Sequence, residues 1–164
     1  MMRALTITSA LAFLLTGVHS VFAETNAISA ELDAFWAEVT RSVSAGDFAG
    51  YAATYHPDAI LVSKANSTSY PIASALKGWE QGFLDTQAGK VDANVEFRFT
   101  GRLHDETTAH ETGIFHYSAA PVEGVATDQY IHFEALLVNK DGWKMMMEYQ
   151  QTPATAAEWA AALK

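Results

Sequence analysis

His132 and Glu134 are the two side chains of this sequence best suited to proton transfer. They lie two residues apart in a stretch, residues 128–138, whose alternating pattern predicts a β-strand. Because strand side chains alternate between faces, both share a face with Tyr130 and Leu136. In an apolar pocket, desolvation raises the pKa of a carboxyl, while an imidazole titrates near neutrality. Such a pair can move a proton between two positions of a small organic molecule.

Other interpretations of this pair stay open. His132 and Glu134 can form a structural hydrogen-bonded pair, or both can face solvent. With His110 or His116 on an adjacent strand they can also form a two-histidine, one-carboxylate metal set. We expect no metal and no cofactor, because a His-x-Glu pattern on a strand is common by chance.

The neighbouring strands supply further candidates, but the register of one of them stays open. Between residues 107 and 118, one register presents Glu111, Phe115 and Tyr117 to the pocket. A slip of one residue presents the set His110, Thr112, Ile114 and His116 instead. In the last strand, residues 143–152, alternation predicts an inward set made up of Met145, Met147, Tyr149 and Gln151.

Three helices and a strand precede these strands and must position them. Ser29 is placed to cap a long amphipathic helix, which Gly46 ends, and Asp47 is placed to cap a short second helix. Pro57 stops the second helix before a buried strand over residues 59–62, and residues 64–70 read as a loop. Pro71 begins a third helix. Four strands follow from residue 91, the first carrying Val95, Phe97 and Phe99.

Helices followed by a run of strands predict an α+β fold, with three N-terminal helices packed in a strongly curved antiparallel sheet. A sheet that curls around its helices forms a cone-shaped α+β barrel with a pocket at the open end. We expect that pocket to hold a small-molecule ligand. The predicted lining residues are Tyr55, Trp79, Phe83, Glu111, Phe115, Met147, Tyr149 and Gln151.

Composition narrows the classes of function. The chain has 164 residues, 49% of them hydrophobic, which favours one globular domain. The formal net charge is -9, and an acidic surface repels phosphate backbones, so we expect no nucleic acid partner. The sequence has no Cys, which excludes disulfides and a thiolate nucleophile.

The first residues have the layout of a secretory signal peptide. A short basic start that includes Arg3 is followed by a largely apolar stretch, and Val21 and Ala23 are small residues suited to a cleavage site. We therefore predict a signal peptide over residues 1–23 and one domain over residues 24–164. The expected product is exported, periplasmic or secreted, and has no stable membrane anchor after cleavage.

Four short pieces of the chain resemble, in order and spacing, the nuclear transport factor 2-like superfamily, which includes SnoaL-like and ketosteroid isomerase-like proteins. They are Ala45-Gly46-Asp47-Phe48, Tyr55-His56-Pro57-Asp58-Ala59, Thr108-Ala109-His110-Glu111-Thr112-Gly113 and Lys140-Asp141-Gly142-Trp143-Lys144. The resemblance implies the cone fold and a homodimer packed sheet on sheet. This superfamily includes isomerases, dehydratases and non-catalytic members, so the fold alone does not imply a reaction.

When the catalytic residues of ketosteroid isomerases are matched to this sequence, most of them are replaced by residues that cannot perform the same role. The general base of those enzymes falls near Ser63 and their tyrosine donor near Val39, neither of which can do that work. Their second donor, an aspartate, aligns with Glu134. The sequence therefore predicts an exported small-molecule-binding domain, or a cofactor-free isomerase- or lyase-type enzyme that uses Glu134 and His132. The alternative is a non-catalytic ligand-binding or dimeric assembly module.

Overall fold

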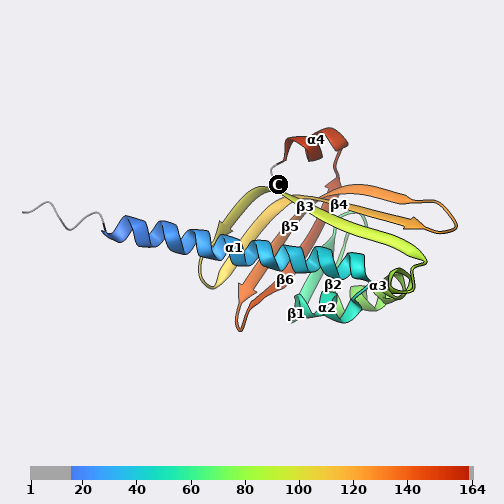
Figure 1. The fold of residues 1–164 in the computed structure, drawn as a ribbon, viewed down its shortest axis with the longest axis horizontal. Helices are drawn as coiled ribbons and strands as arrows, with labels where there is room; N and C mark the ends of the chain where they lie inside the picture. Colours follow the sequence, from blue (N-terminus) through green and yellow to red (C-terminus); the bar gives the residue numbers. More distant parts are fainter. Residues whose placement is uncertain (1–15, 163–164) are drawn as a thin grey trace, which may run out of the picture.

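The computed structural model describes residues 16–162, which form an α+β fold with one curved six-stranded sheet and four helices (Figure 1). Three helices precede the long strands, and the sheet curls around them without closing into a barrel. The predicted fold class is therefore confirmed. Most of the predicted signal peptide, residues 1–15, lies outside the described residues.

The first helix, α1, runs from Thr16 to Ala45 and is longer than the sequence pattern predicts. Ser29 was expected to cap it but lies inside it, with its hydroxyl oxygen 3.0 Å from Nε2 of His104. The physical reason is local: residues 18–28 contain neither Gly nor Pro, so nothing in them stops a helix. Within residues 16–162, none of the helices combines the length and apolar character that crossing a bilayer requires.

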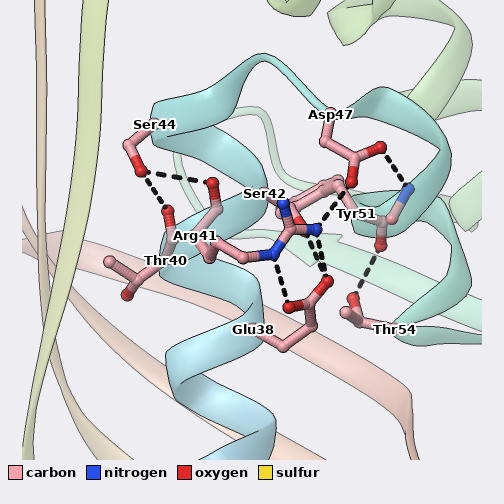
Figure 2. Close-up of polar contacts among 9 residues, drawn as sticks. Glu38, Thr40, Arg41, Ser42, Ser44, Asp47, Tyr51 and Thr54 are labelled. Atoms are coloured by element: carbon pink, nitrogen blue, oxygen red, sulfur yellow. Dashed lines mark hydrogen bonds and ion pairs between the residues drawn. The ribbon is translucent and has the colours of Figure 1, made fainter.

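A charged and capped turn separates α1 from α2, which spans Phe48–Ala53 (Figure 2). The carboxylate of Asp47 accepts the backbone N–H of Gly50 at 2.9 Å and so caps α2, as predicted. The Arg41 guanidinium lies between Glu38 and Asp47, with 2.6 Å contacts to each. This arrangement lowers the pKa of both carboxyls, chiefly through the Arg41 hydrogen bonds.

Gly46 allows the third helix, α3 (Ile72–Gln87), to pack directly on this turn. Its φ of +64° lies in the left-handed region, where a Cβ is unfavourable. A Cβ here would also lie 2.5 Å from the Phe83 carbonyl oxygen and 2.4 Å from the Gln87 nitrogen. The backbone of α3 therefore approaches closer than any side chain at position 46 permits.

The sheet has the strand order β2-β1-β6-β5-β4-β3, so β2 and β3 are its open edges. All neighbours are antiparallel except β1 and β6, which are parallel. The strand bounds are β1 Tyr55–Ser63, β2 Thr68–Pro71, β3 Val91–His104, β4 Thr108–Pro121, β5 Thr127–Asn139 and β6 Trp143–Pro153.

Two local predictions about the chain before α3 were wrong. Tyr55 begins β1 rather than ending the second helix, and Pro57 lies within β1. Pro57 is tolerated there because the pairing of β1 with β6 is interrupted between Tyr55 and Ile60, so its missing N–H breaks no ladder bond. The second error concerns the predicted loop over residues 64–70, whose last part forms β2 and pairs with β1.

The core lies between α1 and the inner face of the sheet. Leu32, Trp36, Val39 and Val43 of α1 are buried, at the helical spacing that the sequence shows. Trp36 donates its indole N–H to the fully buried Glu111 of β4 at 2.5 Å, and Arg102 of β3 also donates to that carboxylate. These bonds join the middle of α1 to the sheet.

A short C-terminal helix, α4 (Ala156–Ala161), covers part of the opposite, outer face of the sheet (Figure 1). Thr155 and Glu158 form a capping box at its start. The Trp159 ring packs near His116 and Tyr130, and the Arg98 guanidinium lies 4.5 Å from its centroid. The outer face is thus covered by α4 over β3, β4 and β5 and lacks a helix elsewhere among the described residues.

Candidate functional site

A cavity of about 450 Å³ lies between the three N-terminal helices and the inner face of the sheet. Its volume falls in the range of small-molecule sites. Most of its lining is apolar or aromatic. The lining residues are Trp36, Val39, Val43, Tyr51, Tyr55, Gly78, Trp79, Gly82, Phe83, Thr86, Ala93, Val95, Phe97, Phe115, Tyr117, Gln129, Ile131, Phe133, Met145, Glu148 and Gln150.

Hydrogen-bonding side chains of the lining converge at one place, which we call the polar cluster: Tyr51, Tyr55, Glu148 and Gln150. The Tyr55 hydroxyl donates to Oε2 of Glu148 at 2.5 Å, and the Tyr51 and Tyr55 hydroxyl oxygens lie 3.0 Å apart. The Gln150 side-chain amide donates to Oε1 of Glu148 at 2.7 Å. Both carboxylate oxygens of Glu148 are thus held in a fixed orientation.

Burial dominates the electrostatics of the polar cluster. Glu148 is 9% exposed, and desolvation raises the pKa of its carboxyl despite the opposing hydrogen bonds from Tyr55 and Gln150. Desolvation, reinforced by the Glu148 charge, also raises the pKa of the Tyr51 and Tyr55 hydroxyls. The tyrosines therefore stay neutral donors at ordinary pH, while Glu148 can change charge closer to neutrality than a solvated glutamate.

Local structure explains how the polar cluster forms. Tyr51 is in α2, and Tyr55 follows four residues later as the first residue of β1, so their rings meet with centroids 5.5 Å apart. Glu148 reaches them from β6, which pairs with β1 in parallel. The pairing of β5 with β6 is irregular: Leu136 is opposite Met147, but Leu137 is opposite Met145. This bulge leaves Met146 unpaired and turns both Met145 and Glu148 inward.

Two groups of aromatic rings surround the cavity. Next to the polar cluster, the Tyr51 ring lies 4.9 Å from Phe83 and 6.1 Å from Trp79, measured between centroids. In the second group, the Trp36 ring lies 4.4 Å from Phe97 and 5.5 Å from Phe133, again between centroids. Exposed lining residues, which include Gly82 of α3 and Gln129 of β5, mark the mouth.

Of the residues that the sequence analysis proposed for the pocket, Tyr55, Trp79, Phe83 and Phe115 line the cavity. Phe115 belongs to the first of the two registers considered for β4, and Tyr117 of that register lines the cavity too. Glu111 is on the same face of β4, but it is fully buried against Trp36 and Arg102 and does not reach the cavity.

The expected inward placement of His132 and Glu134 is corrected by the structure. Ile131 and Phe133 line the cavity, so His132 and Glu134 lie on the outer face of β5. His132 is 3.6 Å from Glu158 of α4, whereas Glu134 is 3.4 Å from His110 and also accepts from Gln151. The two candidates therefore contact different partners and do not form the expected pair. The apolar residues at 131, 133, 135 and 137 indicate the inner face correctly, whereas the match of Glu134 to a ketosteroid isomerase donor favours the opposite face.

The expected inward set of β6 is also corrected, here because of an irregularity in the strand. Met147, Tyr149 and Gln151 lie on the outer face, because the bulge at Met146 shifts the alternation by one residue. Only Met145 of the predicted set faces the cavity. Glu148 and Gln150 line the cavity instead, and neither is among the residues predicted from the sequence.

The two-histidine, one-carboxylate set considered across adjacent strands does not assemble. His116 pairs with Asp128, whereas His132 approaches Glu158. Within residues 16–162, no three His, Asp or Glu side chains come together in a way that could hold a metal ion.

Comparisons with solved structures show that this chain has the fold of nuclear transport factor 2-like proteins. A conserved protein from Planctomyces limnophilus superposes with a TM-score of 0.67 at 13% identity, over 79% of this chain and 99% of the other. A nuclear transport factor 2-like protein of unknown function from Shewanella oneidensis gives 0.59 at 13% identity, over 76% and 98%. A superfamily member from Salmonella enterica serovar Typhimurium gives 0.59 at 12% identity, over 80% and 95%.

At these identities the comparisons establish the fold alone, and the predicted cone fold is confirmed. No protein-family model matches the sequence. No curated protein matches it either. What the cavity does must therefore be argued from its own residues.

Proposed function

We propose that this protein binds a small, largely apolar organic molecule in the cone cavity, with the polar end of that molecule against the polar cluster. One observation carries the proposal. A cavity of about 450 Å³, lined mainly by rings and aliphatic side chains, has a buried carboxyl, Glu148, in a hydrogen-bonded group with Tyr55 and Tyr51. Apolar walls supply affinity by burial, and a few convergent polar groups orient the ligand.

The experiment uses a neutral apolar fluorescent dye, N-phenyl-1-naphthylamine, and a variant that fills the mouth of the cavity. A Cβ at Gly82 meets nothing within 4 Å, so Gly82→Leu has room to fold. Leucine also favours a helix over glycine, by somewhat under about 1 kcal/mol, so loss of binding would not reflect loss of α3. Lys77→Leu is the matched control, an exposed position of α3 outside the lining.

We expect the dye to bind the wild type with quenching of tryptophan fluorescence, because Trp36 and Trp79 line the cavity. Gly82→Leu should weaken binding by about tenfold or more, and Lys77→Leu should leave it unchanged. Failure of the dye to bind, or equal binding by both variants, would contradict the proposal.

A second candidate function is proton transfer, and Glu148 is the residue that supports it. A buried carboxyl with a raised pKa, hydrogen-bonded by a tyrosine hydroxyl, is suited to act as a general base. In this proposal the Glu148 carboxylate takes a proton from a carbon next to a ligand carbonyl and returns it to another position. His132 and Glu134 have no part in it.

Exchange of α-protons of phenylacetone for deuterium, followed by NMR in D₂O, tests this activity. We expect the wild type and Glu134→Gln to accelerate exchange, and Glu148→Gln to lose at least about a hundredfold of the acceleration. Equal rates with and without wild-type protein would leave binding alone as the function.

We further propose export with cleavage after Ala23 and assembly as a homodimer. The first rests on the sequence pattern of residues 1–23, the second on the resemblance to the superfamily. Cleavage after Ala23 predicts a secreted or periplasmic chain whose N-terminal residue is Glu24 and whose mass is that of residues 24–164. Recovery of only the uncleaved chain would contradict export.

A further inference from the structure

The ionisable charge of the cavity lining is negative. Among the residues that the structure describes, the lining includes one carboxyl, that of Glu148, and no Lys, Arg or His side chain. Three cationic side chains on the elements that surround the cavity have partners of their own. Arg41 pairs with Glu38 and Asp47, Arg102 with Asp33 and Glu111, and Lys144 bonds a backbone carbonyl.

A carboxylate buried in this way has no counter-charge of its own. The hydrogen bonds from Tyr55 and Gln150 satisfy one lone pair on each oxygen but carry no positive charge. These hydrogen bonds do not offset the whole cost of desolvating the ionised carboxylate, and burial therefore raises the pKa of Glu148. A cation in the cavity would supply the missing charge.

The surroundings of Glu148 suit an organic cation better than a metal ion. The rings of Tyr51, Tyr55, Trp79 and Phe83 are adjacent, with centroid separations from Tyr51 of 5.5, 6.1 and 4.9 Å to the other three. The faces of such rings attract alkylated ammonium groups, whereas a hard metal ion needs several oxygen ligands. The net charge of -9 also favours the approach of cations over anions.

We propose that the cavity recognises an alkylated ammonium group on an apolar body, with the cation between Glu148 and the rings of Tyr51, Trp79 and Phe83. This inference rests on the small-molecule binding proposed above and narrows the class of ligand. The apolar body of the ligand extends toward the second aromatic group, at Trp36 and Phe97.

The test compares three benzyl alcohols that differ only in the 4-substituent, each titrated calorimetrically into the full chain. The substituents are trimethylammonio, its neutral isostere tert-butyl, and carboxylate. At pH 7.5 we expect the trimethylammonio probe to bind about tenfold or more tightly than the tert-butyl probe, and the carboxylate probe to bind most weakly. Equal affinity for the two isosteres, or tightest binding of the carboxylate, would overturn the inference.

Variants separate the cavity charge from the surface charge. In Glu148→Gln the preference for the cation should fall to about unity, because the glutamine keeps the shape and loses the charge. Glu134→Gln, the same substitution on the outer face, should keep the full preference. A preference that survives Glu148→Gln would assign it to the acidic surface and overturn the inference.

The wild type alone provides a further readout that needs no variant. The trimethylammonio probe has no titratable proton, so its affinity should rise with pH as Glu148 ionises, while that of the tert-butyl probe should not. The other titratable groups around the polar cluster are Tyr51 of α2, Tyr55 of β1 and Tyr117 of β4, and burial raises the pKa of each further above 10. A pH-independent preference would contradict the role of Glu148.

The outcome also distinguishes the two proposals. If the tert-butyl probe binds and the cation binds no tighter, the inference about charge fails and small-molecule binding stands. If none of the probes binds and the dye does not bind either, both fail.

Discussion

Glu148 and Glu134 are two glutamates on neighbouring strands that have opposite environments. Glu148 is on the inner face, nearly enclosed, with a tyrosine hydroxyl on one oxygen and an amide on the other. Glu134 is on the outer face, partly exposed, beside His110 and Gln151. Only the first combines burial, fixed orientation and access to a cavity, which are the conditions for acid-base or charge recognition chemistry.

The buried carboxyl predicts a particular dependence of stability on pH. Because the folded pKa of Glu148 lies above the unfolded value of about 4.5, the folded chain binds this proton more tightly than the unfolded chain. The contribution of this group is complete below the unfolded pKa and is lost as pH rises through the folded pKa. Glu148→Gln cannot ionise and escapes that loss.

We therefore expect Glu148→Gln to gain stability relative to the wild type as pH rises from about 4 to about 8, by a few degrees in melting temperature. Circular dichroism melts of both proteins across that range measure the difference. An offset that stays constant with pH would show that Glu148 does not titrate in this window.

At the scale of elements, the turn between α1 and α2 decides where α3 lies, and α3 forms one wall of the cavity. Gly46 combines a left-handed backbone with close contact to the α3 backbone. Gly89, which follows α3, has a similar φ of +69° but no atom within 4 Å of a Cβ. Substitutions at these two glycines therefore distinguish the cost of backbone strain, which both positions have, from the cost of steric contact, which only Gly46 has.

Gly89→Ala should cost about 1–2 kcal/mol, the penalty of a left-handed backbone for an L-residue. Gly46→Ala should cost clearly more, because α3 must also move away. Urea unfolding of both variants provides the comparison. Equal losses would mean that α3 yields easily at this point, and the position of the cavity wall would then not depend on Gly46.

At the scale of the whole molecule, the two faces of the sheet have different roles. The inner face and its helices enclose the cavity. The outer face is covered by α4 over Arg98, His116 and Tyr130, and elsewhere presents apolar side chains such as Ile60, 39% exposed, and Met147. A homodimer that packs sheet on sheet, as the resemblance implies, would bury this uncovered part.

We expect the wild type to have the mass of a dimer in light scattering. Met147→Glu should have the mass of a monomer, because dimer formation would bury an unpaired carboxylate in the interface. Val125→Glu is the control, because Val125 is 92% exposed on the hairpin between β4 and β5, away from that face. A monomeric wild type would contradict the proposed assembly, and dimeric Met147→Glu would place the interface elsewhere.

The sequence by itself determined the order of the elements apart from β2, and the residues whose position depends on local periodicity. Apolar spacing and alternation are properties of neighbouring residues, so they placed Trp36 and Val39 on one side of α1, and Phe97 on the inner face of β3. They also identified Tyr55, Trp79, Phe83 and Phe115, which line the cavity. For β5 the apolar alternation of the sequence indicates the correct inner face, whereas the match of Glu134 to a ketosteroid isomerase donor favours the opposite face.

Only the tertiary structure decided where the chemistry lies. Whether Met147 or Glu148 faces inward depends on the bulge in β6, which arises from pairing with β5 and has no clear signal in the run of methionines. The bond between Tyr55 and Glu148 joins residues 93 positions apart, across strands that pair in parallel. Periodicity cannot specify such a contact, because it depends on which strands become neighbours and in which register.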